Sequence, residues 1–582
     1  MEKFYLGISL GFNSSACVMS NQRGILAAIS QERLNGEKNT KEVPFDAALK
    51  CLEIANVSEI ETICVSHYEE ISNEYLLKYS KHPIGGYNWQ EMIVSFFEKH
   101  GISVESICRV DHHDAHAFST FGFYGLPKED SILITSDGFG DGSSGRIVDL
   151  SAGKLSDVSL ENSIALVYQF VTGALGFKEH QHEGKITGLA AFGNPIYLEN
   201  FENMYDEVDF GNCLSFKSNL VSLSYEEMEK VKESKIIDFD KFLKLKKTVY
   251  ALVNELIDNG AKREDIAASV QRFSEKWTLN WIANSLKNNL DKKYNAYLAG
   301  GLFANVKINQ IIKDFGFFKN VYVCPAMGDE GTAVGAVIAT MLSVNDSEFD
   351  VENSSKKVIS GSSVDGDEDT YDHICALVNQ NRLQDEMRVT FNRYTSQTID
   401  FISDALAHNK IVCLMRDKME FGPRALCHRS ILYNCNSKDT NDWLNKKLGR
   451  TEFMPFAPVC VEEFADELFL NLDGGRDSAK FMTMTFDCTP EFVQNYPAAC
   501  HIDNTARPQI VSYDDDNFMW SVLMKYYSLT GRKALINTSF NLHNNPIIES
   551  EKVGFESWLT SGTDILVIGN VIVERVENAT EH

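Results

Sequence analysis

Two histidines and two aspartates, widely separated along the chain, have the side-chain types of a metal site. His112 and His116 stand four residues apart, so on a helix both imidazoles would lie on one face. Asp137 and Asp329 each follow an apolar run and enter a glycine-rich turn. A histidine pair alone is also common among hydrogen-bonded core residues, but two imidazoles with two carboxylates suit Fe(II), Mn(II) or Zn(II). We therefore predict a divalent metal site made of these four side chains.

Three further side chains are candidates for catalysis. His113 would lie about 100° around the helix from the other two histidines, which predicts that it supports the ligands from behind. Lys38 and Lys185 are single cations beside turn residues, where a lysine either binds an anion or, more often, is only exposed to solvent. We predict Lys38, His113 and Lys185 as catalytic residues.

Glycine-rich turns in the same regions favour a phosphate ligand. Without a side chain, glycine lets backbone N–H groups approach phosphate oxygens, and a helix N-terminus attracts anions. The Gly300-Gly301 turn stands between a strand-like run and a helix that carries Asn305. We predict a nucleotide site formed by Gly138, Gly140, Gly300, Gly301, Asn305 and Gly328.

The last third of the chain contains a local excess of basic residues. Residues 411–460 hold eight Lys or Arg against five acids, whereas the whole chain has a net charge of −27. Such a reversal indicates an anion site, although a solvated basic face is the alternative. Guanidinium groups bind phosphate oxygens in pairs, and amides and hydroxyls add donors. The predicted set is Arg416, Arg424, Arg429, Ser430, Arg450, Arg507, Asn537, Ser539 and Asn541.

Composition limits the class of protein. A chain of 582 residues is too long for one core and predicts two or three domains. The net charge of −27 repels polyanions and argues against a nucleic-acid partner. The 13 cysteines form no CxxC pair and lie in apolar runs, which is typical of a reduced, cytoplasmic protein. No apolar run reaches the roughly 18 residues of a membrane span.

The order of elements predicts an α/β protein. The chain opens with three consecutive strands and continues with a helix near 45–54, a strand at 62–66, a helix at 88–100, a strand at 106–110, the histidine helix and a hairpin of 131–136 with 145–150. A mostly helical stretch at 165–290 is followed by strands at 296–298 and 321–323 with a helix at 304–315 between them. Two such lobes predict the actin-like ATPase architecture.

Domain boundaries follow from a polar stretch. Residues 346–372 contain nine acids and many Ser and Gly residues, which predicts an acidic linker. The predicted division is a two-lobed domain at 1–345, this linker, and a further α/β domain at 373–582, with a helix from about Asp372.

The motifs together resemble one family. The strings MEFGPRAL at 419–426, PFAP at 455–458, DNTAR at 503–507 and NTSFN at 537–541 occur in this order. With them the chain, from Tyr5 to about Gly569, resembles the O-carbamoyltransferases of the nodulation and antibiotic-tailoring type, such as the tobramycin carbamoyltransferase.

The resemblance implies a two-part enzyme. The N-terminal part is similar to the ATPase-fold proteins that complete threonylcarbamoyl modification of tRNA, and the C-terminal part is similar to YrdC-like proteins. The C-terminal domain would make carbamoyl adenylate from carbamoyl phosphate and ATP, and its arginine set would bind these donors. The metal-bearing domain would transfer the carbamoyl group to a hydroxyl of a small molecule. The implied cofactors are ATP with Mg²⁺ and a second divalent ion, Fe(II) in the first place with Mn or Zn as alternatives. No nucleic acid and no membrane are expected as partners, and a homodimer is compatible with this expectation.

The chain departs from the family pattern at two places. Many members have Gly-His-Asp-Ala-Ser where this chain has Gly11-Phe12-Asn13-Ser14-Ser15, so a histidine there cannot be the general base. Cys427-His428 stands where Gly-Asn is common.

Other classes of function compete with carbamoyl transfer. A tRNA threonylcarbamoyladenosine-type modification enzyme is the first alternative, but it predicts a basic surface, which a net charge of −27 opposes. A sugar-kinase-like binding module would not need the four ligands and the arginine set. A non-haem iron oxygenase would not need the glycine turns.

Overall fold

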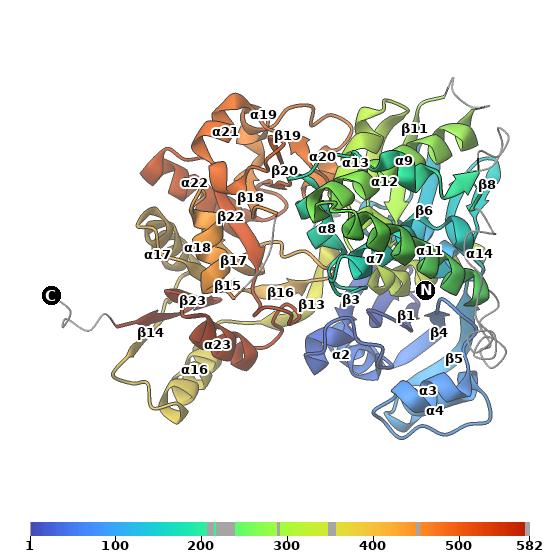
Figure 1. The fold of residues 1–582 in the computed structure, drawn as a ribbon. Coiled ribbons are helices and arrows are strands. Elements are labelled where there is room, and N and C mark those ends of the chain that lie inside the picture. Colours follow the sequence, from blue (N-terminus) through green and yellow to red (C-terminus); the bar gives the residue numbers. More distant parts are fainter. Residues whose placement is uncertain are drawn as a thin grey trace.

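The computed structural model describes residues 2–206, 215–216, 239–287, 292–346, 357–449 and 454–576. It is a mixed α/β protein in which the N-terminal and C-terminal halves lie beside each other (Figure 1). Within these residues, no helix combines the length and the apolar character needed to cross a membrane.

The first sheet is built from the N-terminal 110 residues. Its strand order is β3-β2-β1-β4-β5, with β1 antiparallel to β2, β2 antiparallel to β3, and β1, β4 and β5 parallel to one another. The strands are β1 (Phe4–Ser9), β2 (Ser15–Ser20), β3 (Gly24–Ser30), β4 (Glu59–Ser66) and β5 (Ser103–Val110). The helices α1 (Gln31–Asn35), α2 (Phe45–Ala55), α3 (Asn73–Tyr79) and α4 (Trp89–Lys99) stand between them. The predicted opening of three strands is confirmed.

The second sheet repeats this topology. Its order is β8-β7-β6-β11-β12, and the pairing directions match those of the first sheet strand for strand. The strands are β6 (Ser131–Gly140), β7 (Ser143–Asp149), β8 (Gly153–Val158), β11 (Tyr294–Ala299) and β12 (Phe318–Val323). The two lobes predicted from the order of elements are therefore present as two sheets of the same order.

Two helices join the sheets and carry the site. α5 (His112–Ser119) leaves the last strand of the first sheet and contacts β6, β7 and β11 of the second. α14 (Thr332–Ser343) leaves the second sheet and contacts β1, β2 and β4 of the first. The helices also contact each other, and a Cβ at Gly335 would lie 1.6 Å from Ala115 O, so only glycine permits this close approach.

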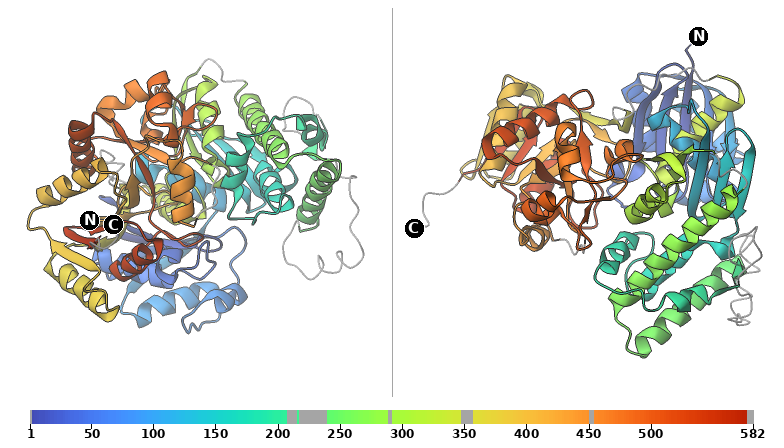
Figure 2. Two further views of the ribbon diagram at one scale, coloured as in Figure 1. Left: turned by 60° about the vertical axis from the view of Figure 1, so that its left-hand side comes forward. Right: turned by 90° about the horizontal axis from the view of Figure 1, so that it is seen from above.

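Helices cover the outer side of the second lobe (Figure 2). They are α7 (Ile164–Ala174), α8 (Glu183–Ala190), α9 (Leu198–Glu202), α11 (Phe239–Asp258) and α12 (Arg263–Leu286). α12 contacts α7, α8 and α9, and buries Trp277 and Trp281 in a core that continues to the strands of the second sheet. α13 (Val306–Asp314) follows β11 through the short helix η2 (Gly301–Ala304), and η3 (Asp329–Gly331) precedes α14.

The C-terminal half contains an eight-stranded sheet of order β14-β24-β23-β15-β17-β22-β18-β21. Its strands are β14 (Met387–Phe391), β15 (Val412–Met415), β17 (Arg429–Tyr433), β18 (Ala457–Val461), β21 (Gln509–Val511), β22 (Ala534–Ser539), β23 (Ile565–Ile568) and β24 (Val571–Arg575). α17 (Thr395–Ala407) and α22 (Asn517–Thr530) contact each other over buried residues such as Leu414 and Val459. α23 (Glu551–Ser561) contacts α16 (Glu368–Gln380), β15 and β23.

The predicted linker is partly ordered structure. Residues 347–356 lie outside the described residues, but β13 (Ile359–Val364) pairs antiparallel with β16 (Asp417–Glu420). α16 begins at Glu368 rather than near Asp372, because the side chain of Asp367 accepts a hydrogen bond from Thr370 N and caps the helix. The domain boundaries remain a prediction, with less linker than the acidic composition indicated.

Candidate functional site

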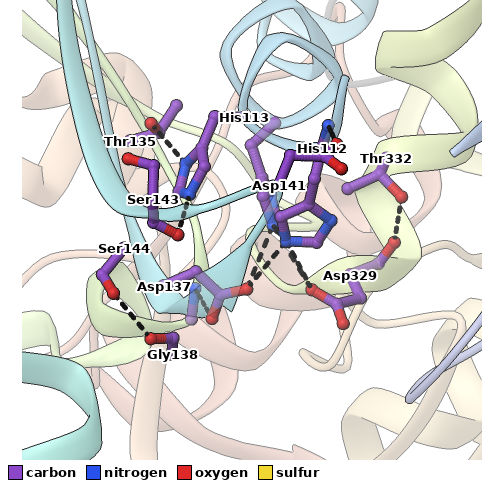
Figure 3. A network of polar contacts seen from close by, with 12 residues as sticks. His112, His113, Thr135, Asp137, Gly138, Asp141, Ser143, Ser144, Asp329 and Thr332 are labelled. Atoms are coloured by element: carbon purple, nitrogen blue, oxygen red, sulfur yellow. Dashed lines mark hydrogen bonds and ion pairs between the residues drawn. The ribbon is translucent and has the colours of Figure 1, made fainter. Parts of the chain in front are cut away.

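The four predicted ligands meet at one point, and Figure 3 shows three of them, His112, Asp137 and Asp329. One ligand atom from each of His112, His116, Asp137 and Asp329 lies within 4.8 Å of the others. Asp137 Oδ2 is 3.2 Å from His112 Nε2 and 3.3 Å from His116 Nε2. Asp329 Oδ1 is 3.3 Å from His116 Nε2. The structure thus brings together residues that are 217 positions apart.

Each ligand is fixed by an element of the fold. Asp111 caps α5 by accepting a hydrogen bond from Asp114 N, so the helix begins at His112. Asp141 Oδ2 accepts a hydrogen bond from His112 N at 2.8 Å. A Cβ at Gly140 would lie 2.1 Å from His112 Cδ2, so the strand can pass beside the imidazole only because residue 140 is glycine.

Other elements hold the carboxylate of Asp137 and the backbone of Asp329. Gly301 N donates to Asp137 Oδ1 at 3.3 Å, and Ser9 Oγ donates to Asp329 O at 2.8 Å. The side chains of Asp137 and Asp329 remain 19% and 16% exposed, whereas the two histidines are buried. An ion or ligand can therefore reach the cluster from the carboxylate side.

The electrostatics of the cluster favour the protonated form of His116. Burial alone would lower the pKa of His116, but hydrogen bonds and charges from Asp137 and Asp329 outweigh it and raise this pKa to about 9. Burial raises the pKa of Asp137, but its histidine partners hold it well below its ordinary value. The pKa of Asp329 is raised by burial and by the charge of Asp137. Without an ion, the proton on His116 partly neutralises the two carboxylates.

The structure does not support a catalytic role for His113. Its Nδ1 lies 3.0 Å from Thr135 Oγ1 and its Nε2 lies 3.0 Å from Ser143 O (Figure 3). The ring is fully buried, and burial followed by the neighbouring histidines lowers its pKa to about 3. Because both nitrogens have protein partners, His113 anchors α5 to β6 and β7, and its catalytic role stays a prediction.

The predicted nucleotide residues divide into two groups. Gly138 and Gly140 lie at the end of β6 with Asp137, Gly301 begins η2, and Gly328 precedes Asp329 at the start of η3. Gly300 N donates to Met327 O at 2.7 Å and so joins the segments before η2 and η3. The side chain of Asn305 has a different role from these glycines. Its Oδ1 caps α13 by accepting from the backbone of Lys307 and Ile308, and its Nδ2 donates to Gln271 Oε1 at 2.8 Å. The Asn305 amide is therefore used by the fold.

The two candidate lysines differ in their surroundings. Lys38 is exposed in the loop between α1 and α2, and Lys185 is buried in α8. Their catalytic roles stay predictions.

Arg429 is a structural residue rather than a phosphate ligand. The side chain is fully buried, and its guanidinium donates to four backbone carbonyls, those of Arg416, His428, Ser362 and Asp417. Burial lowers its pKa to about 10. The guanidinium thus joins β13 to β16 and β17, a use of arginine that residue counting cannot distinguish from anion binding.

Arg416 lines a pocket of about 340 Å³ in the C-terminal half. Its Nε donates to Cys427 O at 3.0 Å, its Nη1 lies 2.9 Å from Asp417 Oδ2, and its Nη2 pairs with Asp516. The other lining residues are Ile359, Lys418, His428, Tyr513, Asp514, Asp515 and Asn517. Acids from 514–516 join the basic segment, so the pocket is not the cation-rich site that local charge predicted.

The polar residues of β22 form a buried network. Asn537 Nδ2 donates to Gln509 Oε1 at 2.6 Å and to Ala425 O at 3.1 Å, while Asn537 Oδ1 is buried without a hydrogen-bond partner among the described residues. Ser430 Oγ accepts from Cys427 N, and Ser539 Oγ donates to Asn541 Oδ1. Arg507 is partly buried and lies beside His501. Burial is the main cause that lowers the pKa of His501, and the charge of Arg507 lowers it further. Arg450 lies outside the described residues.

Sequence reasoning missed a group of residues beside the cluster. The ring of His180 stacks on that of Phe12 at 4.5 Å, and Lys41 Nζ lies 3.7 Å from the Phe12 centroid. Charges on Asp137 and Asp329 act on His180, although burial keeps its pKa below the ordinary value. The departure at Phe12 was the only signal in the sequence, and it did not indicate which distant histidine would contact that ring.

Comparison with known proteins assigns the family. The model of the carbamoyltransferase N-terminus matches residues 5–338, and the model of the carbamoyltransferase C-terminus matches residues 403–575. The chain belongs to the carbamoyltransferase family. It is therefore an enzyme of the transferase class, as the motif strings predicted.

Relatives match this carbamoyltransferase over about half to nearly all of its length. Nodulation protein NolNO of Sinorhizobium fredii is 26% identical over 97% of this chain and 79% of its own length. An uncharacterised protein of Methanocaldococcus jannaschii is 26% identical over 98% of this chain and all of its own. Nodulation protein U of Rhizobium tropici is 31% identical over 48% of this chain and 44% of its own.

Solved structures resemble it only distantly. HypF in its phosphate- and nucleotide-bound form is 14% identical, with a TM-score of 0.31 over 60% of this chain and 56% of that one. Component A of the Acidaminococcus fermentans (R)-2-hydroxyglutaryl-CoA dehydratase is 11% identical, with a TM-score of 0.32 over 58% of this chain and 96% of that one.

Proposed function

We propose that this carbamoyltransferase uses ATP and carbamoyl phosphate to carbamoylate a hydroxyl group of a small molecule. The observation that carries the proposal is the convergence of His112, His116, Asp137 and Asp329 in a chain of this family. The repeated strand order of the two N-terminal sheets supports an actin-like ATPase domain. A YrdC-like fold for the C-terminal half rests on the sequence resemblance.

The chemistry balances in two steps. In the first, carbamoyl phosphate and water give carbamate and phosphate, and a carbamate oxygen attacks the α-phosphorus of ATP, so that carbamoyl adenylate forms and pyrophosphate leaves. In the second, the acceptor oxygen attacks the carbamoyl carbon, the bond to the adenylate oxygen breaks, and AMP and a proton leave.

The four converging side chains fit a divalent cation. His112 Nε2 and His116 Nε2 are 3.2 Å apart with a carboxylate oxygen beside each, so the lone pairs of two neutral rings and two carboxylates would point at one position. These residues would hold the ion, which supplies Lewis-acid polarisation when bound. The donor set suits Fe(II), Mn(II) or Zn(II) alike.

Protein groups around the cluster would position the adenylate. Gly301 and Gly328 present backbone beside the carboxylates, where a phosphate oxygen can approach. Lys185 and Lys38 are the candidate cations for its charge. Holding both reactants at one place supplies rate enhancement through orientation.

The pocket around Arg416 is our candidate for adenylate formation. Lys418 and His428 add polar groups, and the acids at 514–516 suit ATP as its Mg²⁺ complex because the ion offsets their charge. Arg507 is a further candidate phosphate ligand.

Mass spectrometry tests this proposal. The enzyme, ATP, Mg²⁺, Mn²⁺ and carbamoyl phosphate are incubated with a panel of hydroxylated metabolites, and we expect one product to gain a single carbamoyl group. The variant His116→Ala should give no such product. Transfer to tRNA in place of every small acceptor would instead favour a threonylcarbamoyladenosine-type enzyme.

A further inference from the structure

The segment 419–426, which carries the predicted anion-binding residue Arg424, docks against the N-terminal half. A Cβ at Gly422 would lie 2.7 Å from Pro325 O, so the two backbones touch there. Arg33 Nη2 donates to Gly422 O at 2.8 Å. Arg424 follows two residues later, so the docking delivers its side chain to the N-terminal half.

Arg424 contacts the short helix η2, which also holds the carboxylate of Asp137. Its Nη2 donates to Ala304 O at 3.2 Å, and Ala304 ends the same short helix η2 whose first residue, Gly301, donates to Asp137 Oδ1. The charge of Glu330, the residue directly after Asp329, also acts on Arg424. The guanidinium is therefore linked to a segment that holds Asp137 and to the neighbour of Asp329.

The donors of this guanidinium are not used up. Arg424 Nε is buried and has no hydrogen-bond partner among the described residues, although the side chain as a whole is only partly buried. Burial lowers the pKa of Arg424 to about 10, so it remains charged at neutral pH. A buried, charged donor without a partner is costly unless a ligand completes it.

Arg424 is also separate from the C-terminal pocket. The residues that line that pocket include Arg416, Lys418 and His428 but not Arg424. The arginine set predicted from the sequence as one donor site is thus distributed over different places, and Arg424 contacts η2 of the N-terminal half.

We propose that Arg424 is a phosphate-binding residue that the C-terminal half contributes to the transfer site. Resting on the proposed function, its ligand is the phosphate of the carbamoyl adenylate, a nucleoside monophosphate ester, held between the guanidinium and the cluster. The residue stabilises the charge that grows on AMP as the carbamoyl bond breaks, and it makes transfer depend on docking of the two halves.

Two measurements on the full chain separate this role from adenylate formation. The first is the Mn²⁺-dependent part of AMP binding, obtained by calorimetry with and without the ion. The second is pyrophosphate release from ATP in the presence of carbamoyl phosphate. For Arg424→Ala we expect AMP affinity to fall at least about 10-fold and pyrophosphate release to stay within about twofold. The AMP affinity of Arg424→Lys should lie between those of Arg424→Ala and the wild type, because lysine keeps the charge but lacks the paired donors of the guanidinium.

Arg33→Ala is the matched control, because it removes a contact of the same interface, at Gly422 O, and leaves the Arg424 side chain in place. It should bind AMP like the wild type, and thermal unfolding checks that each variant is folded. Equal loss of AMP affinity in Arg33→Ala and Arg424→Ala would reduce Arg424 to an interface contact. Unchanged AMP affinity with lost pyrophosphate release, or no Mn²⁺-dependent AMP binding in the wild type, would also overturn the proposal. Absence of pyrophosphate release in the wild type would instead remove the proposed function, while the AMP measurement would still decide the role of Arg424.

Discussion

Metal binding at the cluster should release a proton, because the ion and the His116 proton compete for one ring. The quantity to vary in this experiment is the pH at which the ion binds. The pKa of His116 is raised to about 9, although burial opposes this, because Asp137 and Asp329 stabilise the imidazolium. An ion can bind His116 Nε2 only after that proton leaves.

The size of the effect follows from the pKa. At pH 7 the ring is about two units below its pKa of about 9, so the apparent affinity for the ion is lowered about 100-fold, or about 2.7 kcal/mol. The affinity should therefore rise about 10-fold per pH unit from pH 7 and level off above pH 9.

Calorimetry with Mn²⁺ in two buffers of different ionisation enthalpy measures the released protons. We expect about one proton per ion at pH 7 to 8. In His116→Gln the affinity should be weaker and its pH dependence over this range should disappear. A wild-type affinity that does not change with pH, with no proton released, would refute the charge distribution described for the cluster.

Other predictions concern stability and packing. In the metal-free enzyme, the His116 imidazolium stabilises the fold fully below pH 6.5 and loses this effect as pH rises through 9. Over this range the free energy of unfolding in urea should therefore fall by up to about 3 kcal/mol. Added Mn²⁺ should restore the lost stability. A rise in stability over that range would contradict this. Gly140→Ala places a methyl group 2.1 Å from His112 Cδ2, so we expect at least about 10-fold weaker Mn²⁺ binding by calorimetry with an unchanged circular dichroism spectrum; unchanged affinity would show that the ring has room to move. Arg429→Met removes the guanidinium donor of the buried carbonyls of Arg416 and Ser362 and should destabilise the C-terminal half by about 3 kcal/mol in urea unfolding, whereas the Mn²⁺ affinity should not change. A stable variant with lost pyrophosphate release would return Arg429 to the phosphate-binding set.

The cluster was predictable because its signals are local. His112 and His116 share a helix face by spacing alone, and Asp137 and Asp329 each stand where a strand-like run meets glycine. The two-lobed N-terminal fold was predictable for a similar reason, because three consecutive strands and the later strand and helix pairs have clear boundaries in the sequence.

Residues whose role depends on distant backbone were not predictable. His113 has the same neighbours in sequence as the two ligands, but Ser143 O and Thr135 take up its two nitrogens. In the sequence Arg429 resembles an anion-binding arginine, but in the fold its guanidinium donates to Ser362 O of β13. β13 itself was hidden by the acidic composition around it, since its pairing with β16 supplies the order that the local sequence does not indicate.

The central claim is that this carbamoyltransferase activates carbamoyl phosphate as an adenylate. Phosphorus NMR of the purified enzyme with ATP, Mg²⁺ and carbamoyl phosphate tests it most directly. The account predicts equal amounts of phosphate and pyrophosphate, with AMP appearing as the adenylate is consumed and no pyrophosphate when carbamoyl phosphate is omitted. Formation of ADP in place of pyrophosphate, or pyrophosphate that does not require carbamoyl phosphate, would contradict it.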